Sequence, residues 1–332
     1  MLHNKNLYEI KKETENIYLD SQTKKFVDSI SNAKPIYTLS LNDARDVLNK
    51  IQKDESYKNK VDIQHLNIDT DKSNIDLDIF RPKNNKTRLP IVYYVHGGGW
   101  ILGNSQTHGR LMTEIAVQTN SAVVFINYSP APEKKYPTQI IQGLEGLYYV
   151  YNNAKTLNLD ANNIIIMGDS VGGNMATVIA MLVNEKQGPK LKYQILAYPT
   201  IDASMNTPSY KKYAQGPWLT QKSMKWFFDA YENDANTRLN PTISPIRASR
   251  KNISGLPPTL ILVDENDVLR DEGENYAYKL MEAGVETSSV RILGVIHDFL
   301  MLDPLKDSPN VKIAMDIIIS KIKNIFYGIN KN

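Results

Sequence analysis

Cysteine is absent from this 332-residue chain, as are long apolar runs and an excess of one charge. Zero cysteines exclude disulfides, thiol nucleophiles and cysteine metal sites. No stretch reaches the roughly 18 consecutive apolar residues that a transmembrane helix needs. The 39 basic and 36 acidic residues leave a net charge of +3 without a basic block, so no nucleic-acid partner is expected.

The first twenty residues contain neither an apolar signal-peptide core nor a small-residue cleavage site. Together with the missing cysteines, this favours a cytoplasmic protein. We expect a small-molecule ligand and no transmembrane segment, and we allow for a homodimer.

The N-terminal region, about residues 1–55, is predicted to be helical. Leu7, Ile10, Thr14 and Ile17 fall roughly on one helical face. A second helix is expected to begin at Ser40, which has capping-box spacing to Asp43. We interpret the region as a helical arm packed on the body. The alternative, an amphipathic membrane-surface segment, would need a more basic and more hydrophobic face.

Apolar residues alternate with polar ones on both sides of a polar loop near residue 70, which predicts an antiparallel strand pair. From Pro90 onward the pattern changes to short, nearly continuous apolar runs separated by helical patterns. The runs are "IVYYV", "AVVFINY", "IIIMG", "YQILAYP", "TLILVD" and "SSVRIL". Buried strands that alternate with helices predict a mostly parallel central sheet flanked by helices, in a single α/β domain.

An aromatic-rich insertion at about residues 202–250 interrupts this alternation. It contains Trp218, Trp226, Phe227 and Phe228, and it is expected to lie as a lid over one end of the sheet. For Phe227 and Phe228 we favour a core position.

Ser170 lies in "GDSVGG", between the strand "IIIMG" and an apolar-periodic helix. G-x-S-x-G at a strand-to-helix junction predicts a nucleophile elbow, with the serine Oγ exposed above the helix N-terminus. The competing interpretation is a phosphate-binding turn, but G-x-G-x-x-G and a P-loop lysine are both missing.

Three consecutive glycines follow "VYYVH" and are favoured where backbone amides must approach a ligand. We expect the N–H groups of Gly98, Gly99 and Val171 to surround an oxyanion. His96 precedes the turn and is expected to order the loop by hydrogen bonding rather than to act as the base. The alternative is that the three glycines form a flexible turn that binds no ligand.

These motifs resemble those of bacterial hormone-sensitive-lipase-like carboxylesterases of the α/β-hydrolase superfamily. The resemblance covers roughly residues 75–325 and rests on "HGGGW", "NYSPAPEKKYP", "GDSVGG", "NDVLRDEG" and "VIHDF" in this order. It implies an α/β-hydrolase fold with a helical cap formed by about residues 1–55 and 202–250. It also implies Ser170 as nucleophile, Asp267 as the orienting acid and His297 as general base.

The chain departs from the family pattern in a few places. Val171 replaces an alanine, Val268 replaces a proline, and Asp298 replaces the glycine after the histidine. Ser129 and Pro130 stand where the family has Arg and Leu, which should remove an ion pair. Asp298 is expected to raise the pKa of the neighbouring base.

Among the five histidines, His297 follows the last strand, so the chain order is serine, acid, histidine, as the fold requires. His3 and His65 are expected at the surface, and His108 at the start of a helix. Among the nearby acids, Asp271 and Glu272 are expected in the first turn of a helix, whereas Asp264 directly follows an apolar run.

The predicted activity is that of a serine carboxylesterase that hydrolyses short-chain acyl esters through an acyl-enzyme, without metal or organic cofactor. Trp100, Trp218 and Trp226 are expected to crowd the acyl pocket and to favour chains of about two to six carbons, as the resemblance also implies. The alternatives are an amidase or deacetylase of small acetylated compounds and a non-catalytic receptor with a hydrolase fold.

Overall fold

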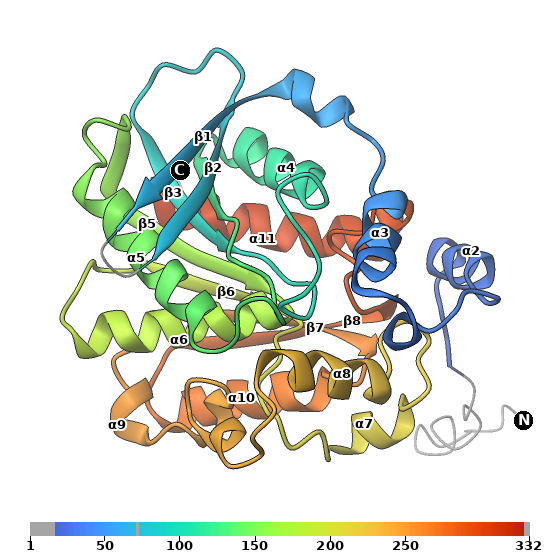
Figure 1. Ribbon diagram of the computed structural model, residues 1–332. Helices are drawn as coiled ribbons and strands as arrows, with labels where there is room; N and C mark the ends of the chain where they lie inside the picture. Colours follow the sequence, from blue (N-terminus) through green and yellow to red (C-terminus); the bar gives the residue numbers. More distant parts are fainter. Residues whose placement is uncertain (1–16, 71–72, 329–332) are drawn as a thin grey trace, which may run out of the picture.

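The computed structural model describes residues 17–70 and 73–328, which fold around one central sheet (Figure 1). The sheet has eight strands: β1 (Val61–Asp69), β2 (Asn74–Pro82), β3 (Leu89–Val95), β4 (Ala122–Ile126), β5 (Leu159–Asp169), β6 (Tyr193–Ala197), β7 (Thr259–Asn266) and β8 (Thr287–Ile296). Their order across the sheet is β1-β2-β4-β3-β5-β6-β7-β8. The pairs β1/β2 and β2/β4 are antiparallel, and all the other neighbouring pairs are parallel. This confirms the predicted mostly parallel sheet and the predicted antiparallel pair at its beginning.

Strands β3 to β8 coincide with the apolar runs of the sequence, and β1 and β2 with the two alternating segments before them. Every residue of β3, β4 and β6 is buried, because helices cover both faces of the parallel part. The edge strand β1 is mostly exposed or half-buried.

Helices form a layer on each face of the sheet. The α-helices are α2 (Ser21–Ser29), α3 (Leu41–Ile51), α4 (Gly109–Thr119), α5 (Thr138–Asn152), α6 (Val171–Glu185), α7 (Pro208–Lys212), α8 (Gln221–Tyr231), α9 (Arg250–Ile253), α10 (Arg270–Glu282) and α11 (Pro309–Tyr327). Short 3-10 turns are η1 (Ile36–Thr38), η2 (Ser56–Lys60), η3 (Thr237–Leu239), η4 (Pro245–Arg247) and η5 (Asp303–Leu305). Figure 1 shows α4 and α11 on one face and α5 and α6 on the other.

Helix α3 begins as its sequence predicts. The Ser40 side chain accepts a hydrogen bond from the N–H of Asp43 and caps the helix. Helix α2 lies within the N-terminal region predicted to be helical, although its bounds were not predicted; it is capped by Asp20 and buries Phe26. The predicted helix around Leu7, Ile10 and Thr14, together with His3, lies outside the described residues.

The N-terminal helices and the aromatic insertion meet at the carboxyl end of the sheet. Figure 1 shows α2, α3, α7 and α8 beyond the end toward which β7 and β8 point. The rings of Phe26 in α2 and Trp218 in the insertion are 5.3 Å apart, and η1 contacts α8. Segments nearly 200 residues apart therefore pack together at the edge where parallel sheets place their active sites (218 − 26 = 192 residues).

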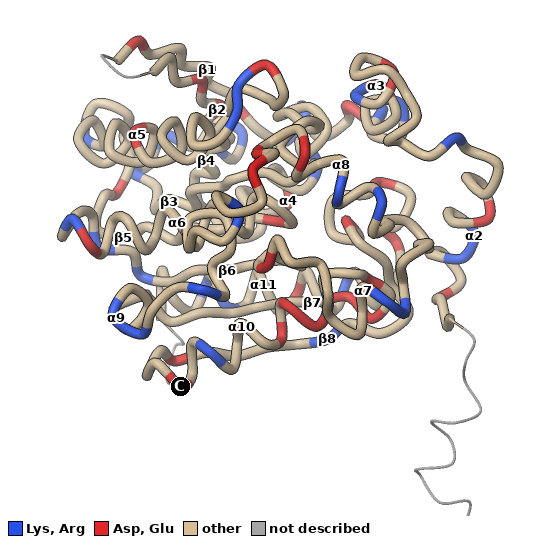
Figure 2. Tube along the Cα trace, turned by 60° about the horizontal axis from the view of Figure 1, so that its bottom comes forward, with Lys and Arg blue, Asp and Glu red and all other residues tan. Residues whose placement is uncertain are grey.

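Basic and acidic residues are distributed over the whole described molecule, and both signs occur in most parts of it (Figure 2). Several of them form pairs within a helix, such as Lys24 with Asp28 and Lys225 with Asp229. None of the described helices is both long and apolar enough to cross a membrane.

Candidate active site

Ser170 occupies the single residue between β5 and α6, and its backbone is strained. Its φ of 54° and ψ of −125° are unusual for a residue with a side chain. The strain is held from both sides, because the Ser170 N–H donates to the Ala197 carbonyl at 2.9 Å and the Ser170 carbonyl accepts from the Thr200 N–H at 3.0 Å. The predicted sharp turn is therefore fixed by the neighbouring strand β6.

The glycines around Ser170 are required by close approach of the backbone. A side chain on Gly168 would collide with the Gly172 carbonyl, and one on Gly172 would collide with the carbonyl of Val95 in β3. Helix α6 thus begins in contact with the ends of β3 and β5. Its N-terminus lies at the serine, where the unpaired amides and the helix dipole favour negative charge.

Ser170, His297 and Asp267 form a hydrogen-bonded chain. Nε2 of His297 lies 2.9 Å from Oγ of Ser170, and Nδ1 lies 2.7 Å from Oδ2 of Asp267. All three side chains are buried. Ser170 follows the carboxyl end of β5, Asp267 that of β7 and His297 that of β8. The parallel sheet therefore brings together residues that are distant in sequence.

The glycine loop after β3 faces the same cavity as Ser170. Gly98 and Gly99 have φ of 101° and 64°, values that favour glycine. No hydrogen bond between described residues uses the N–H of Gly98, Gly99 or Val171. Gly98 and Gly99 line the cavity, and Val171 is buried next to Ser170 at the start of α6.

Asp169, which the sequence analysis did not single out, holds this loop in place. Its Oδ1 accepts from the N–H of Gly97 at 2.9 Å and from Oη of Tyr94 at 2.8 Å, and its Oδ2 lies 3.5 Å from Nε2 of His108. Burial opposes the charge, but His108 and Tyr94 hold the pKa of Asp169 below its ordinary value. The role of Asp169 could have been predicted from the sequence, because an acidic residue stands inside the glycine-rich motif "GDSVGG".

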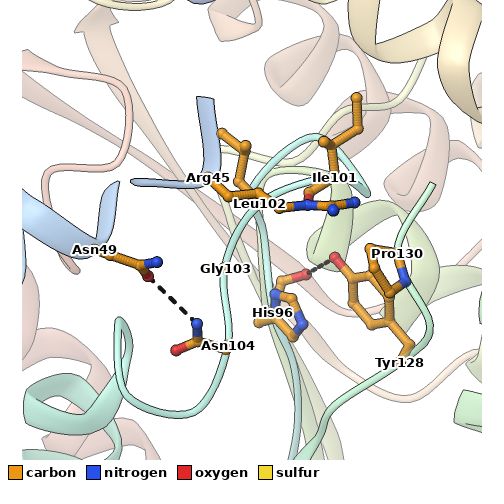
Figure 3. Close-up of a pocket in the computed structure, with 9 residues that line it drawn as sticks. All are labelled: Arg45, Asn49, His96, Ile101, Leu102, Gly103, Asn104, Tyr128 and Pro130. Carbon is orange, nitrogen blue, oxygen red and sulfur yellow. Dashed lines mark hydrogen bonds between the residues drawn. The ribbon is translucent and has the colours of Figure 1, made fainter. Parts of the chain in front are cut away.

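His96 orders the loop, as predicted. Its Nδ1 lies 2.7 Å from the Gly97 carbonyl, and its ring stacks on Tyr128, with centroids 4.1 Å apart. Burial lowers the pKa of His96 to about 3, so the ring is neutral and its Nδ1–H donates. Figure 3 shows Tyr128 donating in turn to the His96 carbonyl.

Arg45 of α3 ties the N-terminal region to the glycine loop (Figure 3). Its guanidinium donates to the carbonyls of Ile101 and Ala131 and forms a bidentate pair with Glu133. Glu133 belongs to the segment in which Ser129 and Pro130 were expected to remove an ion pair. The expected loss concerned an arginine at position 129, which this chain lacks; Glu133 forms its ion pair with Arg45 of α3.

Asp298 lies next to the imidazole in the cavity. Its Oδ1 is 3.4 Å from Nε2 of His297, and its Oδ2 accepts from Nε1 of Trp218 at 2.8 Å. Burial lowers the pKa of His297, but the carboxylates of Asp267 and Asp298 outweigh burial and raise it above the ordinary value. The φ of Asp298 is 66°, a conformation suited to the glycine that the family has there.

The other nearby acids have separate positions. Asp264 lies inside β7 and is fully buried. Asp271 and Glu272 lie in the first turn of α10, as predicted, but both also make tertiary contacts. Asp271 accepts from the N–H of Ser209, and the buried Glu272 accepts from the N–H of Ile201.

A cavity of about 430 Å³ opens above Ser170, within the usual range of ligand pockets. It runs from the glycine loop to α2, η1 and α3, and Trp218 and Phe227 line it. The prediction was wrong for Trp100 and Trp226, which do not line it. Trp100 is buried and stacks on Tyr231, with centroids 4.1 Å apart. Phe227 is buried in the core, as expected, and also lines the cavity.

Asp264, Asp267 and His297 are the group among the described residues that could together hold a metal ion, with ligand atoms within 4.8 Å of one another. Nδ1 of His297 is already hydrogen-bonded to Asp267. Carboxylate and imidazole in this geometry are suited to orienting a base.

Comparison with known proteins places the chain among hydrolases. Residues 92–301 match the model of the family described as alpha/beta hydrolase fold. A protein of Acanthamoeba polyphaga mimivirus, named for the alpha/beta hydrolase fold, is 54% identical over 307 residues, which cover 92% of this chain and 88% of that protein. An ethyl acetate hydrolase of Pseudomonas putida is 31% identical over 257 residues, covering 76% of this chain and 80% of that protein. The crystal structure of a thermostable esterase from Pseudomonas putida ECU1011 has a TM-score of 0.89 and 40% identity, covering 93% of this chain and 98% of that one.

Proposed function

This chain belongs to the alpha/beta hydrolase fold family, and we propose that it is a serine carboxylesterase acting on short-chain acyl esters. One observation carries the proposal. The chain of hydrogen bonds from Ser170 through His297 to Asp267 opens onto a cavity that Gly98 and Gly99 also line, and their N–H groups have no hydrogen-bond partner among the described residues. Relatives named as esterases support the substrate class.

Acylation begins when His297 takes the proton of Ser170 and Oγ attacks the ester carbonyl. The developing oxyanion accepts hydrogen bonds from the N–H groups of Gly98, Gly99 and Val171. Asp267 keeps Nδ1 protonated and thereby keeps Nε2 free to accept the proton. The protonated His297 then gives that proton to the leaving alcohol.

Deacylation repeats these steps with water. His297 takes a proton from a water molecule, the resulting hydroxide attacks the acyl group on Ser170, and the same amides stabilise the oxyanion. Collapse of the intermediate returns the proton to Oγ and releases the carboxylic acid. The side chains of this chain thus account for every proton in the reaction.

The shape of the cavity favours small acyl groups. The Phe227 ring packs directly against Gly99, and Trp218 borders the cavity near His297 and Asp298. We propose that residues 17–55 and the insertion at about 202–250 act as a cap that bounds the site. The predicted part of this cap in residues 1–16 lies outside the described residues.

A chain-length series of nitrophenyl esters tests the proposal. We expect the highest kcat/KM between the acetate and the hexanoate, and stoichiometric labelling of Ser170 by a fluorophosphonate. The Ser170→Ala variant should neither turn over nor be labelled. Efficient cleavage of long-chain triglycerides with activation at an oil–water interface would refute the short-chain preference.

An amidase or deacetylase would use the same residues, so turnover of matched acetate esters and acetamides separates it from an esterase. A non-catalytic receptor would show neither hydrolysis nor labelling. Membership of the bacterial hormone-sensitive-lipase-like group, a cytoplasmic location and a homodimer remain predictions from the sequence.

A further inference from the structure

Asp264 is a buried acid that the proposed mechanism does not use. It lies in β7, three residues before Asp267, with none of its surface exposed. Neither of its carboxyl oxygens receives a hydrogen bond from the described residues, and neither does Oδ1 of Asp267. Three buried acceptor oxygens without a donor, close beside the His297 ring, require an explanation.

The carboxylates of Asp264 and Asp267 have oxygens within 4.8 Å of each other. If both were ionised in this buried site, they would repel each other strongly. A single proton shared between the acids removes the repulsion and supplies the missing donor. Oδ2 of Asp267 already accepts from His297, so Oδ1 is the oxygen that still needs a donor. The proton therefore belongs on Asp264.

We propose that Asp264 is a positioning residue, whose protonated carboxyl group donates a hydrogen bond to Oδ1 of Asp267 and so fixes the carboxylate that orients His297. The proposal rests on the proposed function, because it assigns Asp264 a part in the same triad. With one oxygen held by Asp264 and the other by His297, the Asp267 carboxylate cannot rotate away from the ring.

The electrostatics of the site support a proton on Asp264. Burial raises the pKa of Asp264 well above its ordinary value, and the charge of Asp267 raises it further, against the opposing effect of His297. The titratable groups that face Asp264 are Asp267, His297 and, from the end of β6, Tyr198.

Two substitutions separate this role from simple packing. Asp264→Asn keeps both the size and a donor, whereas Asp264→Leu keeps approximately the size and removes the donor. We expect Asp264→Asn to retain kcat on nitrophenyl acetate within about 3-fold, with an unchanged acid limb of the pH–rate profile. Asp264→Leu should lower kcat by about 10- to 100-fold, the loss expected for one hydrogen bond to a charged group, with KM little changed.

Two results would overturn the proposal. One is a wild-type kcat in Asp264→Leu. The other is a shift of the Asp264→Asn acid limb to lower pH by about one unit, which would show that the wild-type Asp264 carries a charge near His297. If Asp264→Leu gives no cooperative melting transition, the acid limb of Asp264→Asn decides alone.

A spectroscopic measurement keeps this proposal distinct from the proposed function. The proton between Nδ1 of His297 and Asp267 should give a downfield proton resonance that Asp264→Asn retains and Asp264→Leu shifts or broadens. If the wild-type protein hydrolyses no ester, the proposed function fails, yet this resonance still tests Asp264. An identical resonance in wild type and Asp264→Leu would count against the positioning role.

Discussion

Replacing Asp298 with asparagine should move the acid limb of the pH–rate profile to lower pH. His297 must be neutral to accept the serine proton, and the carboxylate 3.4 Å from its Nε2 stabilises the protonated form. Asparagine removes the charge and retains an oxygen that can accept from Trp218. It also tolerates the left-handed backbone at this position, where φ is 66°.

The separation of the two groups sets the size of the shift. Coulomb's law gives about 1.2 kcal/mol for unit charges 3.4 Å apart at the dielectric constant of water, and about 5 kcal/mol at an effective constant of about 20. These energies correspond to about 1 to 3.5 pH units. Burial raises the pKa of Asp298 itself, so part of its charge is lost at acid pH and the shift should lie near the lower limit.

The assay is kcat/KM for nitrophenyl acetate measured across the acid limb in wild type, Asp298→Asn and Asp298→Gly. Both variants should show the same shift, because both remove the charge at a backbone conformation that suits them. Asp316→Asn on the exposed face of α11 is the matched control for loss of one acid and should leave the profile unchanged. Superimposable profiles for wild type and Asp298→Asn would refute the reasoning.

The remaining predictions concern the orienting acid Asp267, the hydrogen bonds of Arg45 and the cavity beside Trp218. Asp267→Asn should fold normally and lose about 10⁴-fold in kcat, by analogy with the serine-protease triad, whereas Asp271→Asn should stay active; circular dichroism and steady-state kinetics check both. The choice of acid is wrong if Asp267→Asn turns over like wild type. Arg45→Met should cost about 1–2 kcal/mol of unfolding free energy and several-fold in kcat, since it frees the glycine loop; denaturant titration that finds wild-type stability would contradict this. Trp218→Ala should shift the ester chain-length optimum upward, and an unchanged optimum would show that Trp218 does not bound the acyl group.

Much of the fold follows from local sequence patterns. Fully apolar runs bounded by turns predicted the buried parallel strands, and period-two alternation predicted β1 and β2, because side-chain direction along a strand depends only on neighbouring residues. The cap of α3 at Ser40 was predictable for the same reason. The bounds of α2 within the predicted helical region could not be read from the sequence, since the helix buries only Thr23 and Phe26.

A candidate site residue could be placed from the sequence alone where its motif contains the neighbours that its geometry requires. Gly168 and Gly172 must lack side chains for a helix to begin in contact with a strand, so the motif around Ser170 indicates its geometry directly. For Trp100 and Trp226, the sequence did not allow their position relative to the cavity to be predicted. Aromatic residues near a site favour a pocket by composition alone, but which of them faces it depends on packing between segments far apart in the chain.

The sequence by itself indicated the fold class, the elbow at Ser170 and the glycine loop, because the patterns that predict them lie within short segments of the chain. The choice of Asp267 and His297 as acid and base followed from the resemblance to a known family. Only the tertiary structure decided that Glu133 pairs with Arg45, and that the buried carboxylates of Asp264 and Asp267 lie close together with oxygens that lack a donor among the described residues. These contacts depend on how α3 packs on the body and on how the chain turns at the end of β7. Their energies depend on distance and burial, which exist only once the sheet has brought those elements together.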